Sequence, residues 1–462
     1  MRNTTVPTIV ESLASGALAE LDERVQLPDI QGNVLKAYRR HHAFYLFVRF
    51  DAKTVRGNPA LRSLFGKHVS SAARQNAMSA EWRRLTEGQQ AFPATDGSGP
   101  FSDPAGMFAL TASGYRHFGI AGGVPISDEL GDDIWKFGMR PDEDAVPPYY
   151  WRSSPEQWEK NYKEEIHGLF LLADDSLERL LETRRAFKRE LSTIGVVVAE
   201  ERGARLLSGP RGAEGDIEHF GFKDGMSKVA SPSAVFTPED PWRNGVAGKQ
   251  TFGCFATFLK IEQNVLAFEQ ESAALGAAVC AKGITISKQQ AQELAVGRTK
   301  DGSLIYPLVD RLNGRPIKSP GAVPFAVKGA SAPIECPHHA HIRVMNGQDH
   351  AHQIALVRRG MVYGTDLYNE WTQDGIRQLP PSSGAGLLFL SFQRSLRDFT
   401  ALISRAYKRG DPILTHKHYV PDGQTWDFAG KKIAHTMAGM TTIRGGEYFY
   451  VPSMPFLEYL SS

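Results

Sequence analysis

The stretch HGLFLLADDSLERLLETRRAFKRELSTIGVVVAEE, residues 167–201, contains one complete strand–helix–strand unit. Its first part, 167–175, is an apolar run of strand length that ends at two aspartates. The middle part, 176–194, has apolar residues at helical spacing, and Ser176 stands where a helix N-cap is favoured. The last part, 195–201, begins with β-branched residues typical of a strand. The unit predicts a fold in which strands and helices share one core.

The same plan recurs along the chain. Three further apolar runs predict strands, and each is followed by a helical pattern: HAFYLFVRF (42–50), CFATFLKIEQN (254–264) and GLLFLSF (386–392). Pro59 stands where the helix after the first of these runs would start. Since the alternation lacks a strict short rhythm, we expect an α+β fold with mixed or antiparallel sheets rather than a doubly wound parallel sheet.

A stretch rich in Pro, Ser and Gly, SPSAVFTPEDPWRNGVAGK (231–249), interrupts this alternation and is typical of a linker. We therefore predict two domains that share the same α+β arrangement of strands and helices. The predicted division is an N-terminal arm (1–26), an N-terminal domain (27–228), a linker (229–250) and a C-terminal domain (251–462).

Composition limits the classes of function. The chain has 462 residues, 42% of them apolar and 23% charged, and a formal net charge of +2, so neither nucleic acid nor a membrane is an expected partner. The three cysteines form no CxxC pair, which favours a reducing compartment. The start of the chain meets Glu11 before any apolar run of signal-peptide length. We expect a cytoplasmic protein, with export by a non-classical route left open; no pattern indicates an oligomeric state.

The segment CPHHAHIRV, residues 336–344, concentrates three histidines. On a strand, His339 and His341 would point to one face and His338 to the other. One imidazole is enough to hold a haem iron, whereas zinc or non-haem iron needs three or more ligands. The alternative is that the segment binds no metal and consists of surface histidines with one histidine in the core.

Two other segments carry polar groups in unusual settings. In EHFGFKDGMSK (218–228), Gly221 and Gly225 flank Asp224, so the backbone there can turn tightly or approach a flat ligand. In ALVRRGMVYG (355–364), a strand-like run leads into Arg358 and Arg359. Alone, the first is also explained by an Asp-Gly turn and the second by a solvated charge pair.

Together the three segments supply an imidazole, an acid and a fixed cation. A haem peroxidase needs these parts, because the acid moves a proton between the oxygens of peroxide and the cation stabilises charge as the O–O bond breaks. A haem carrier has no use for the acid and the cation. A non-haem metal protein, with His339, His341 and His350 or His352 on a cupin-like β fold, remains a separate possibility.

The sequence strongly resembles the dye-decolourising peroxidases, in particular the larger bacterial and fungal members. The resemblance covers roughly residues 27–455 and is carried by these stretches: DIQGNVLKAYRRHHAFYLFVRF, GFKDG, CPHHAHIR, RRGMVYG, GLLFLSFQRSL and IRGGEYFYVPS. GFKDG matches the family's GxxDG motif, and AHIR matches its proximal segment. The resemblance implies two ferredoxin-like domains with haem b (iron protoporphyrin IX) between them.

The resemblance also implies residue roles. His341 is the expected iron ligand, Asp224 the distal acid–base, and Arg358 the distal cation, with Arg359 as the fallback. Arg343 matches the position that pairs with a haem propionate. The other positions implied to contact the haem are Gly221, Phe222, Gly225, Leu387 and Phe389.

The implied reaction uses hydrogen peroxide to oxidise dyes, phenols and other aromatic small-molecule donors by one-electron steps. A carboxylate base stays ionised in mildly acidic solution, so an acidic pH optimum is expected. Bulky dyes would react through a relay to the surface, for which Tyr363 and Trp371 are the candidates. A haem-handling enzyme, such as a dechelatase or a porphyrinogen oxidase, would share the same haem site and is the main rival.

Overall fold

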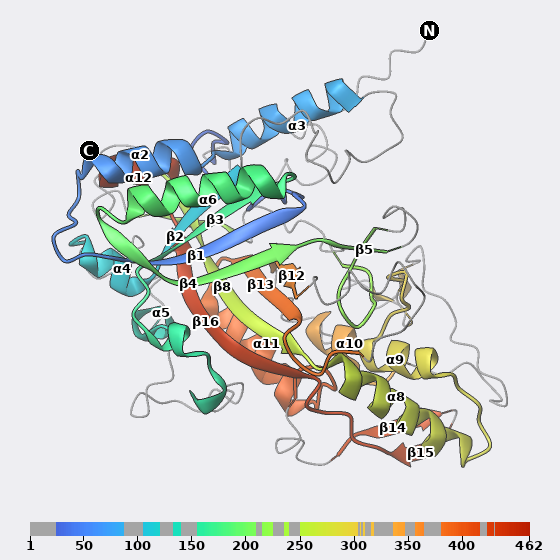
Figure 1. Cartoon of the computed structure of the whole chain (residues 1–462). Helices are drawn as coiled ribbons and strands as arrows, with labels where there is room; N and C mark the ends of the chain where they lie inside the picture. Colours follow the sequence, from blue (N-terminus) through green and yellow to red (C-terminus); the bar gives the residue numbers. More distant parts are fainter. Residues whose placement is uncertain are drawn as a thin grey trace, which may run out of the picture.

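The computed structural model describes part of the chain. The described residues are 25–86, 105–120, 133–139, 155–208, 215–224, 235–239, 250–303, 305, 308–309, 316–317, 336–346, 356–364, 380–415, 423–428 and 430–462. Figure 1 shows their arrangement, with the N-terminal sheet and its helices above the C-terminal strands. Two of the residues predicted to be functional, Gly225 and Trp371, lie outside this part.

The N-terminal unit has the order strand, helices, strand, helices, strand, helix, strand. Its elements are β1 (His42–Phe50), α2 (Pro59–His68), α3 (Ala72–Thr86), β2 (Ala105–Leu110), α4 (Ala112–His117), α5 (Asp133–Phe137), η3 (Pro155–Gln157), η4 (Lys160–Lys163), β3 (Gly168–Asp174), α6 (Leu177–Leu191) and β4 (Gly195–Ala204). The four strands pair in the order β4-β1-β3-β2, all antiparallel. This order is the ferredoxin-like arrangement.

The C-terminal unit repeats the plan with longer insertions. After the short strands β5 (Leu206–Ser208), β6 (Gly215–Ile217) and β7 (Thr237–Pro238), it contains β8 (Phe252–Gln263), α8 (Val265–Cys280), α9 (Lys288–Val296), β9 (Leu308–Val309), β10 (Pro316–Ile317), α10 (His341–Asn346), β11 (Val357–Arg358), β12 (Met361–Tyr363), β13 (Gly386–Gln393), α11 (Leu396–Lys408), β14 (Thr425–Phe428), β15 (Lys431–Ala434), β16 (Thr441–Val451) and α12 (Met454–Ser461). Its main strands pair as β16-β8-β13-β12, again antiparallel.

The two sheets join edge to edge into a closed ring. On one side Val362 of β12 pairs with Ala204 of β4, and on the other Tyr450 of β16 pairs with Leu110 of β2. Because β13 pairs with both β12 and β8, the circuit β12-β4-β1-β3-β2-β16-β8-β13 closes on itself. Closure removes free sheet edges, which would otherwise pair with other chains.

Aromatic side chains from both units fill the interior of this ring. Phe258 of β8 is fully buried, and its ring centroid lies 4.7 Å from that of Phe47 and 5.6 Å from that of Tyr45, both on β1. Tyr162 of η4 stacks on the same Phe258 ring at 6.1 Å. Alternate residues of a strand point to opposite faces, so the other face of each sheet is left for the helices.

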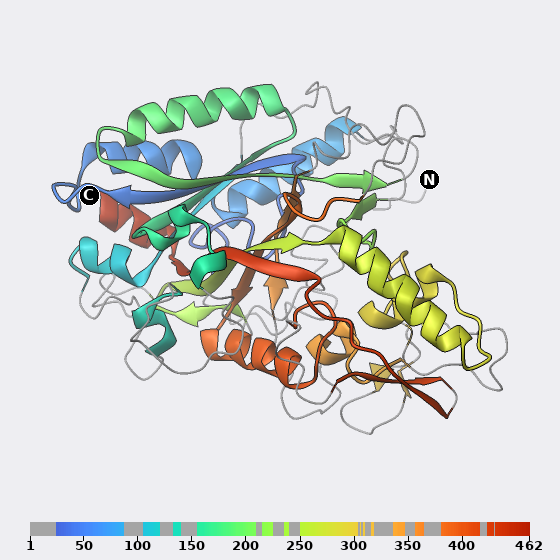
Figure 2. The same ribbon diagram turned by 60° about the horizontal axis from the view of Figure 1, so that its bottom comes forward.

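Helices cover the outer faces. Helices α2 and α6 lie over the N-terminal sheet, and α11 lies against β8 and β13 on the outside of the C-terminal sheet. Helices α8 and α9 and the β14–β15 hairpin form a lobe at one end of the C-terminal unit (Figure 2). Across the described ranges, no helix is both long enough and apolar enough to cross a bilayer.

The predicted fold class is confirmed: both units are α+β, with antiparallel sheets. The Ser176 hydroxyl caps α6 by accepting a hydrogen bond from the Arg179 backbone N–H at 3.3 Å. The single helical pattern expected after Pro59 is instead two helices. The chain is extended at Val69, and the Ser70 backbone N–H donates to the Gly106 carbonyl at 2.9 Å, so these residues bond to β2 rather than to a helix of their own. The predicted domain boundaries stay a prediction.

The interior rings provide a test of the fold. Replacing Phe258 by alanine removes a fully buried ring that contacts side chains of the other unit, so we expect the free energy of unfolding to fall by about 3–5 kcal/mol. Urea unfolding followed by fluorescence measures this change. Val196→Ala, at a side chain that is 47% exposed, is the matched control and should change stability by at most about 0.5 kcal/mol. Equal losses in the two variants would contradict the role given to the interior rings.

Candidate active site

The centre of the site is a hydrogen bond between His341 and Asp411. His341 is the first residue of α10, and its Nδ1 lies 2.8 Å from Oδ2 of Asp411, just beyond the end of α11. The Asp411 carboxylate is fully buried, and its Oδ1 accepts hydrogen bonds from the backbone N–H groups of Ile413 at 2.8 Å and Leu414 at 3.2 Å. Every oxygen of this buried acid therefore has a partner, as a buried charge requires.

The pair fixes the state of the imidazole. A carboxylate only accepts hydrogen bonds, so Nδ1 of His341 must carry a hydrogen, and in the neutral ring Nε2 on the opposite edge carries the lone pair. A histidine that binds a metal usually donates its other N–H in this way, and the contact makes the ligand more basic. His341 therefore has the state of a metal ligand.

The turn before α10 is held against α9. Gly297, the C-cap of α9, has φ +90°, and a Cβ there would lie 3.4 Å from the Cβ of Ala340 and 3.5 Å from Sγ of Cys336. Glycine is suited to this left-handed position, and its missing side chain leaves room for the turn. The turn in this way sets where α10, and with it His341, begins.

The expectation of a strand across the histidines is wrong. Residues 336–340 form a turn and His341 starts a helix, so His339 and His341 do not share a strand face. His339 is buried, with its ring 4.5 Å from that of the fully buried Trp426 in an edge-to-face contact. Burial lowers the pKa of His339 to about 4. His338 is exposed, and His341 is the half-buried histidine whose ring is hydrogen-bonded to a buried carboxylate.

The predicted distal segment is a compact loop after β6. The Glu218 carboxylate accepts hydrogen bonds from the backbone N–H groups of Phe220 and Phe222, both at 2.9 Å, and from Nε2 of Gln263 at 2.6 Å. Burial raises the pKa of Glu218. Gly221 between them has φ +82°, the left-handed conformation that glycine adopts without strain. The conformation of the loop is therefore stabilised by hydrogen bonds to the Glu218 carboxylate.

Lys300 holds the same loop from the other side. Its ammonium group donates to the Phe220 carbonyl and lies 3.9 Å from the centroid of the Phe222 ring. Burial lowers the pKa of Lys300 to about 8. Phe222, predicted to contact the cofactor, is buried beneath this ammonium group. The Lys223 backbone N–H donates to the Lys300 carbonyl at 3.0 Å, next to Asp224.

Asp224 ends the described part of the loop. Its backbone N–H donates to the Asp216 carbonyl at 2.8 Å, and its side chain is half-buried. Within the described residues, no hydrogen bond or ion pair engages the Asp224 carboxylate. It is thus held in place by its backbone while its acid group remains available.

Strand register places three more predicted residues on one face. Arg358 of β11 lies opposite Ser391 of β13, and directly opposed residues in an antiparallel pair point to the same side of the sheet. Leu387 and Phe389 alternate with Ser391, so they share that side, and both are only half-buried. The ring of Phe389 lies 6.2 Å from that of Phe399 on α11. Arg358, Leu387 and Phe389 thus lie on the outer face, towards α11.

The neighbouring arginines are engaged elsewhere. Arg359 points to the other side of the strand, where its guanidinium donates to the carbonyls of Asn33, Val34 and Leu35 at 2.8–3.0 Å. Arg343, one turn into α10, is buried and donates to the Cys336 carbonyl. Of the two candidates for the distal cation, Arg358 has an exposed side chain, whereas the guanidinium of Arg359 is bound to backbone carbonyls; the role of Arg358 stays a prediction.

Of the two relay candidates, only Tyr363 lies in the described part of the chain. It is 9% exposed, and burial raises the pKa of its phenol, with a smaller contribution from Glu262. The Lys260 ammonium lies 5.2 Å from the centroid of its ring, and no described group hydrogen-bonds its hydroxyl.

These residues fit a flat apolar group with one iron-binding position. Phe220 and Phe222 of the distal loop lie in the same hydrophobic cluster as Ala340 and Ile342, which flank His341. On β13, Leu388 and Leu390 are fully buried, whereas Leu387 and Phe389 are only half-buried. The outer face of the sheet therefore keeps exposed apolar surface that a ligand could cover. The described residues predicted to hold the haem therefore lie on α10, in the 215–224 loop and on the outer face of the C-terminal sheet, whereas the resemblance implied a haem between the two domains; the position of the haem stays a prediction.

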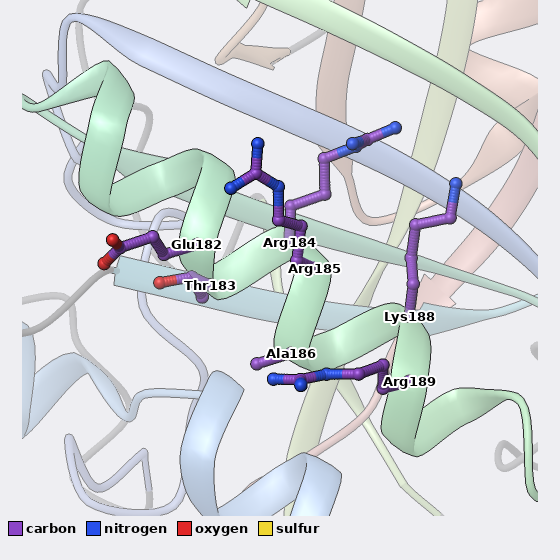
Figure 3. Close-up of a pocket in the computed structure, with 7 residues that line it drawn as sticks. All are labelled: Glu182, Thr183, Arg184, Arg185, Ala186, Lys188 and Arg189. Atoms are coloured by element: carbon purple, nitrogen blue, oxygen red, sulfur yellow. The ribbon is translucent and has the colours of Figure 1, made fainter.

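A separate surface hollow runs along α6 between Glu182 and Arg189 (Figure 3). Two of its cations are already paired, because Arg184 and Lys188 both contact Glu200. It lies over the N-terminal sheet and contains none of the predicted site residues.

Three supporting residues were not predicted from sequence: Asp411, Glu218 and Lys300. Asp411 stands 70 positions after His341, and no spacing rule links the two. Its only local signal is its place after Gly410 at the end of a helical pattern. Glu218 stood at the start of a quoted motif, but its role depends on a loop conformation that the sequence does not state.

Comparison with known proteins agrees with this geometry. Residues 216–424 match the family model described as "Dyp-type peroxidase, C-terminal". The chain is 25% identical to the multifunctional dye peroxidase DyP2 of Amycolatopsis sp., over 98% of this chain and all of that protein. It is 24% identical to a dye-decolorizing peroxidase of Exidia glandulosa, over 93% of this chain and 86% of that protein.

Solved structures share the fold. The DyP-type peroxidase of Anabaena sp. superposes with a TM-score of 0.71 at 24% identity, covering 94% of each chain. DyP2 of Amycolatopsis sp. superposes with a TM-score of 0.69, covering 96% of each chain. Residues 216–424 match the DyP-type C-terminal family, and nearly the whole chain aligns with curated dye peroxidases, so the chain is similar to the DyP-type peroxidases along its length and is a peroxidase.

Proposed function

We propose that this protein uses hydrogen peroxide to oxidise dyes, phenols and other aromatic donors in one-electron steps, with haem b as its cofactor. The observation that carries the proposal is the buried Asp411–His341 pair, which leaves Nε2 of His341 free to bind iron. The curated relatives support the choice of substrate, since their names describe peroxidases that act on dyes.

The residues that would hold the haem come from three segments. His341 would bind the iron through Nε2, Leu387 and Phe389 would pack against the macrocycle, and Arg343 would pair with a propionate. Arg343 donates a hydrogen bond to the Cys336 carbonyl, which holds its guanidinium near α10, and a guanidinium has five N–H donors in a fork that suits a carboxylate. Bound haem supplies an iron centre that accepts oxidising equivalents from peroxide and passes them to donors singly.

Asp224 and Arg358 act on the peroxide. The Asp224 carboxylate takes the proton from one oxygen of hydrogen peroxide and returns it to the other, which leaves as water. The Arg358 guanidinium stabilises the negative charge that develops while the O–O bond breaks. The backbone anchoring of Asp224, whose carboxylate has no partner among the described residues, supports the first role, and the position of Arg358 on the same face as Leu387 and Phe389 supports the second.

Asp224→Asn tests the acid–base role. The amide has nearly the same shape but cannot take the proton, so we expect the rate constant for reaction with hydrogen peroxide to fall about 10²–10⁴-fold. Stopped-flow absorption measures this rate, and an unchanged haem content shows that the site is intact. Asp301→Asn, in the exposed loop beside Lys300, is the control. A normal peroxide rate in Asp224→Asn would remove Asp224 from the mechanism.

Asp411→Asn tests the proximal pair. An amide at this position no longer supplies an anionic acceptor to Nδ1 of His341, so the ligand becomes less basic. We expect the iron reduction potential to rise and haem affinity or activity to fall about 10–100-fold. Spectroelectrochemistry and haem titration measure the two effects. Asp398→Asn on α11 is the control, and a potential equal to that of the parent protein in both variants would contradict the proposal.

The relay proposal concerns large donors. We propose that Tyr363 and Trp371 carry electrons from donors too bulky to reach the haem. Replacing both with phenylalanine should lower turnover of a large anthraquinone dye while sparing a small phenol, because phenylalanine is much harder to oxidise. Steady-state assays with both donors test this expectation. Tyr45→Phe is the control, since that buried hydroxyl also lacks a described partner; parallel loss of both donors, or of neither, would refute the relay.

A further inference from the structure

All three guanidinium nitrogens of Arg359 donate hydrogen bonds to backbone carbonyls. Its Nε donates to the Asn33 carbonyl at 2.8 Å, and its Nη2 donates to the carbonyls of Val34 and Leu35, both at 3.0 Å. Its Nη1 donates to the Arg358 carbonyl at 2.8 Å. Burial lowers the pKa of Arg359 to about 10, which still leaves it a cation at neutral pH.

The carbonyls that it binds belong to a segment tied to both units. Gln31 in this segment donates through Nε2 to the carbonyls of Phe108 on β2 and of Pro452 after β16, both at 2.8 Å. The Asn33 backbone N–H donates to Oε1 of Gln75 at 2.9 Å. Residues 31–35, which we call the N-terminal clasp, therefore have a fixed position relative to both sheets.

The strand that carries Arg358 needs such an anchor. Only two residue pairs, Val357 with Phe392 and Arg358 with Ser391, join β11 to β13 in the described part. The ladder is then interrupted at Arg359 and Gly360 before β12 resumes at Met361. The Arg359 backbone N–H donates to the Leu390 carbonyl at 2.7 Å, so its backbone faces β13 while its side chain reaches the clasp.

We infer that Arg359 is a positioning residue for Arg358. Adjacent side chains of a strand point to opposite faces, so the grip of Arg359 on the N-terminal clasp fixes the rotation of β11 about its own axis. That rotation decides where the Arg358 guanidinium stands on the outer face. The inference rests on the proposed role of Arg358 and gives the clasp, which belongs to the IQGNVL stretch, a function at the site.

The test compares Arg359→Met, Arg359→Lys, Arg358→Gln and the double variant Arg358→Gln/Arg359→Met as full-length holoenzymes. Two quantities are measured: amide hydrogen exchange in 31–35 and 357–363, and the rate constant with which peroxide changes the haem absorption. Arg62→Met, at an exposed arginine on α2, is the matched control.

We expect Arg359→Met to speed exchange in both segments and to slow the peroxide reaction about 10–100-fold, because small displacements of a charge-stabilising group are costly. Arg359→Lys should lose less, since its ammonium retains charge but lacks the fork of donors. The double variant should be no slower than Arg358→Gln alone, because Arg359 acts through Arg358.

Four outcomes would overturn the inference. The first is a loss of peroxide rate in the double variant equal to the sum of the two single losses. The second and third concern Arg359→Met: faster amide exchange with a normal peroxide rate, or unchanged amide exchange. The fourth is a slow peroxide reaction in Arg359→Met together with a normal one in Arg358→Gln. A normal rate in Arg358→Gln also rejects the role proposed for Arg358, separately from the exchange result.

If Arg359→Met does not fold, Gly32→Ala disturbs the clasp from its other side. A Cβ at Gly32 would lie 2.7 Å from Oη of Tyr38 and 3.0 Å from Oε1 of Gln75. We expect the same pattern with a smaller loss, and an unchanged peroxide rate despite faster exchange in the clasp would overturn the inference.

Discussion

The hydrogen bond between Asp411 and His341 is the constraint on which the site depends. A carboxylate without solvent is unfavourable unless its oxygens are paired, and here two backbone N–H groups and one imidazole N–H provide the pairing. The acid in turn selects the neutral tautomer in which Nε2 carries the lone pair, as the proposed iron ligand requires. Folding must therefore bring the end of α11 against the start of α10 before the histidine has its working form. This requirement links the packing of two helices directly to the chemistry of one nitrogen atom.

The two units share one plan but differ in their connections, and the site lies in that difference. In the N-terminal unit, α6 ends at Leu191 and β4 begins at Gly195, so the helix returns to the sheet almost at once. In the C-terminal unit, α11 ends at Lys408 and β16 begins at Thr441, and Asp411 lies in that longer connection. His341 likewise lies in the long connection between α8 and β11. Insertions on a repeated scaffold thus supply both members of the pair, while the strands supply the fixed face opposite them.

Local features could be predicted from the sequence, because local residues cause them. The run 42–50 is β1 to the residue, and Ser176 caps the helix that the pattern after it indicated. The tautomer-fixing acid could not be predicted, since the contact joins residues 70 positions apart. The histidine segment misled for a related reason: period-two spacing suggested a strand, but packing against the C-cap of α9 makes it a turn that leads into α10. Family resemblance selected His341, and the geometry supplies a physical reason for that choice.

Arg358 and Arg359 show how strand geometry places two residues of the same type in different environments. Arg358 and Arg359 are chemically identical, so no rule based on residue type can assign them. Register can, because pairing of Arg358 with Ser391 sends one guanidinium to the outer face and the next to the N-terminal clasp. A neutral side chain at 359 would leave the carbonyls of Asn33, Val34 and Leu35 without these donors, and unpaired buried carbonyls are unfavourable. A lysine has three donors on one nitrogen and lacks the planar fork that reaches all of them at once. The second arginine is therefore explained by the carbonyls it binds, and the first lies on the outer face with Leu387 and Phe389.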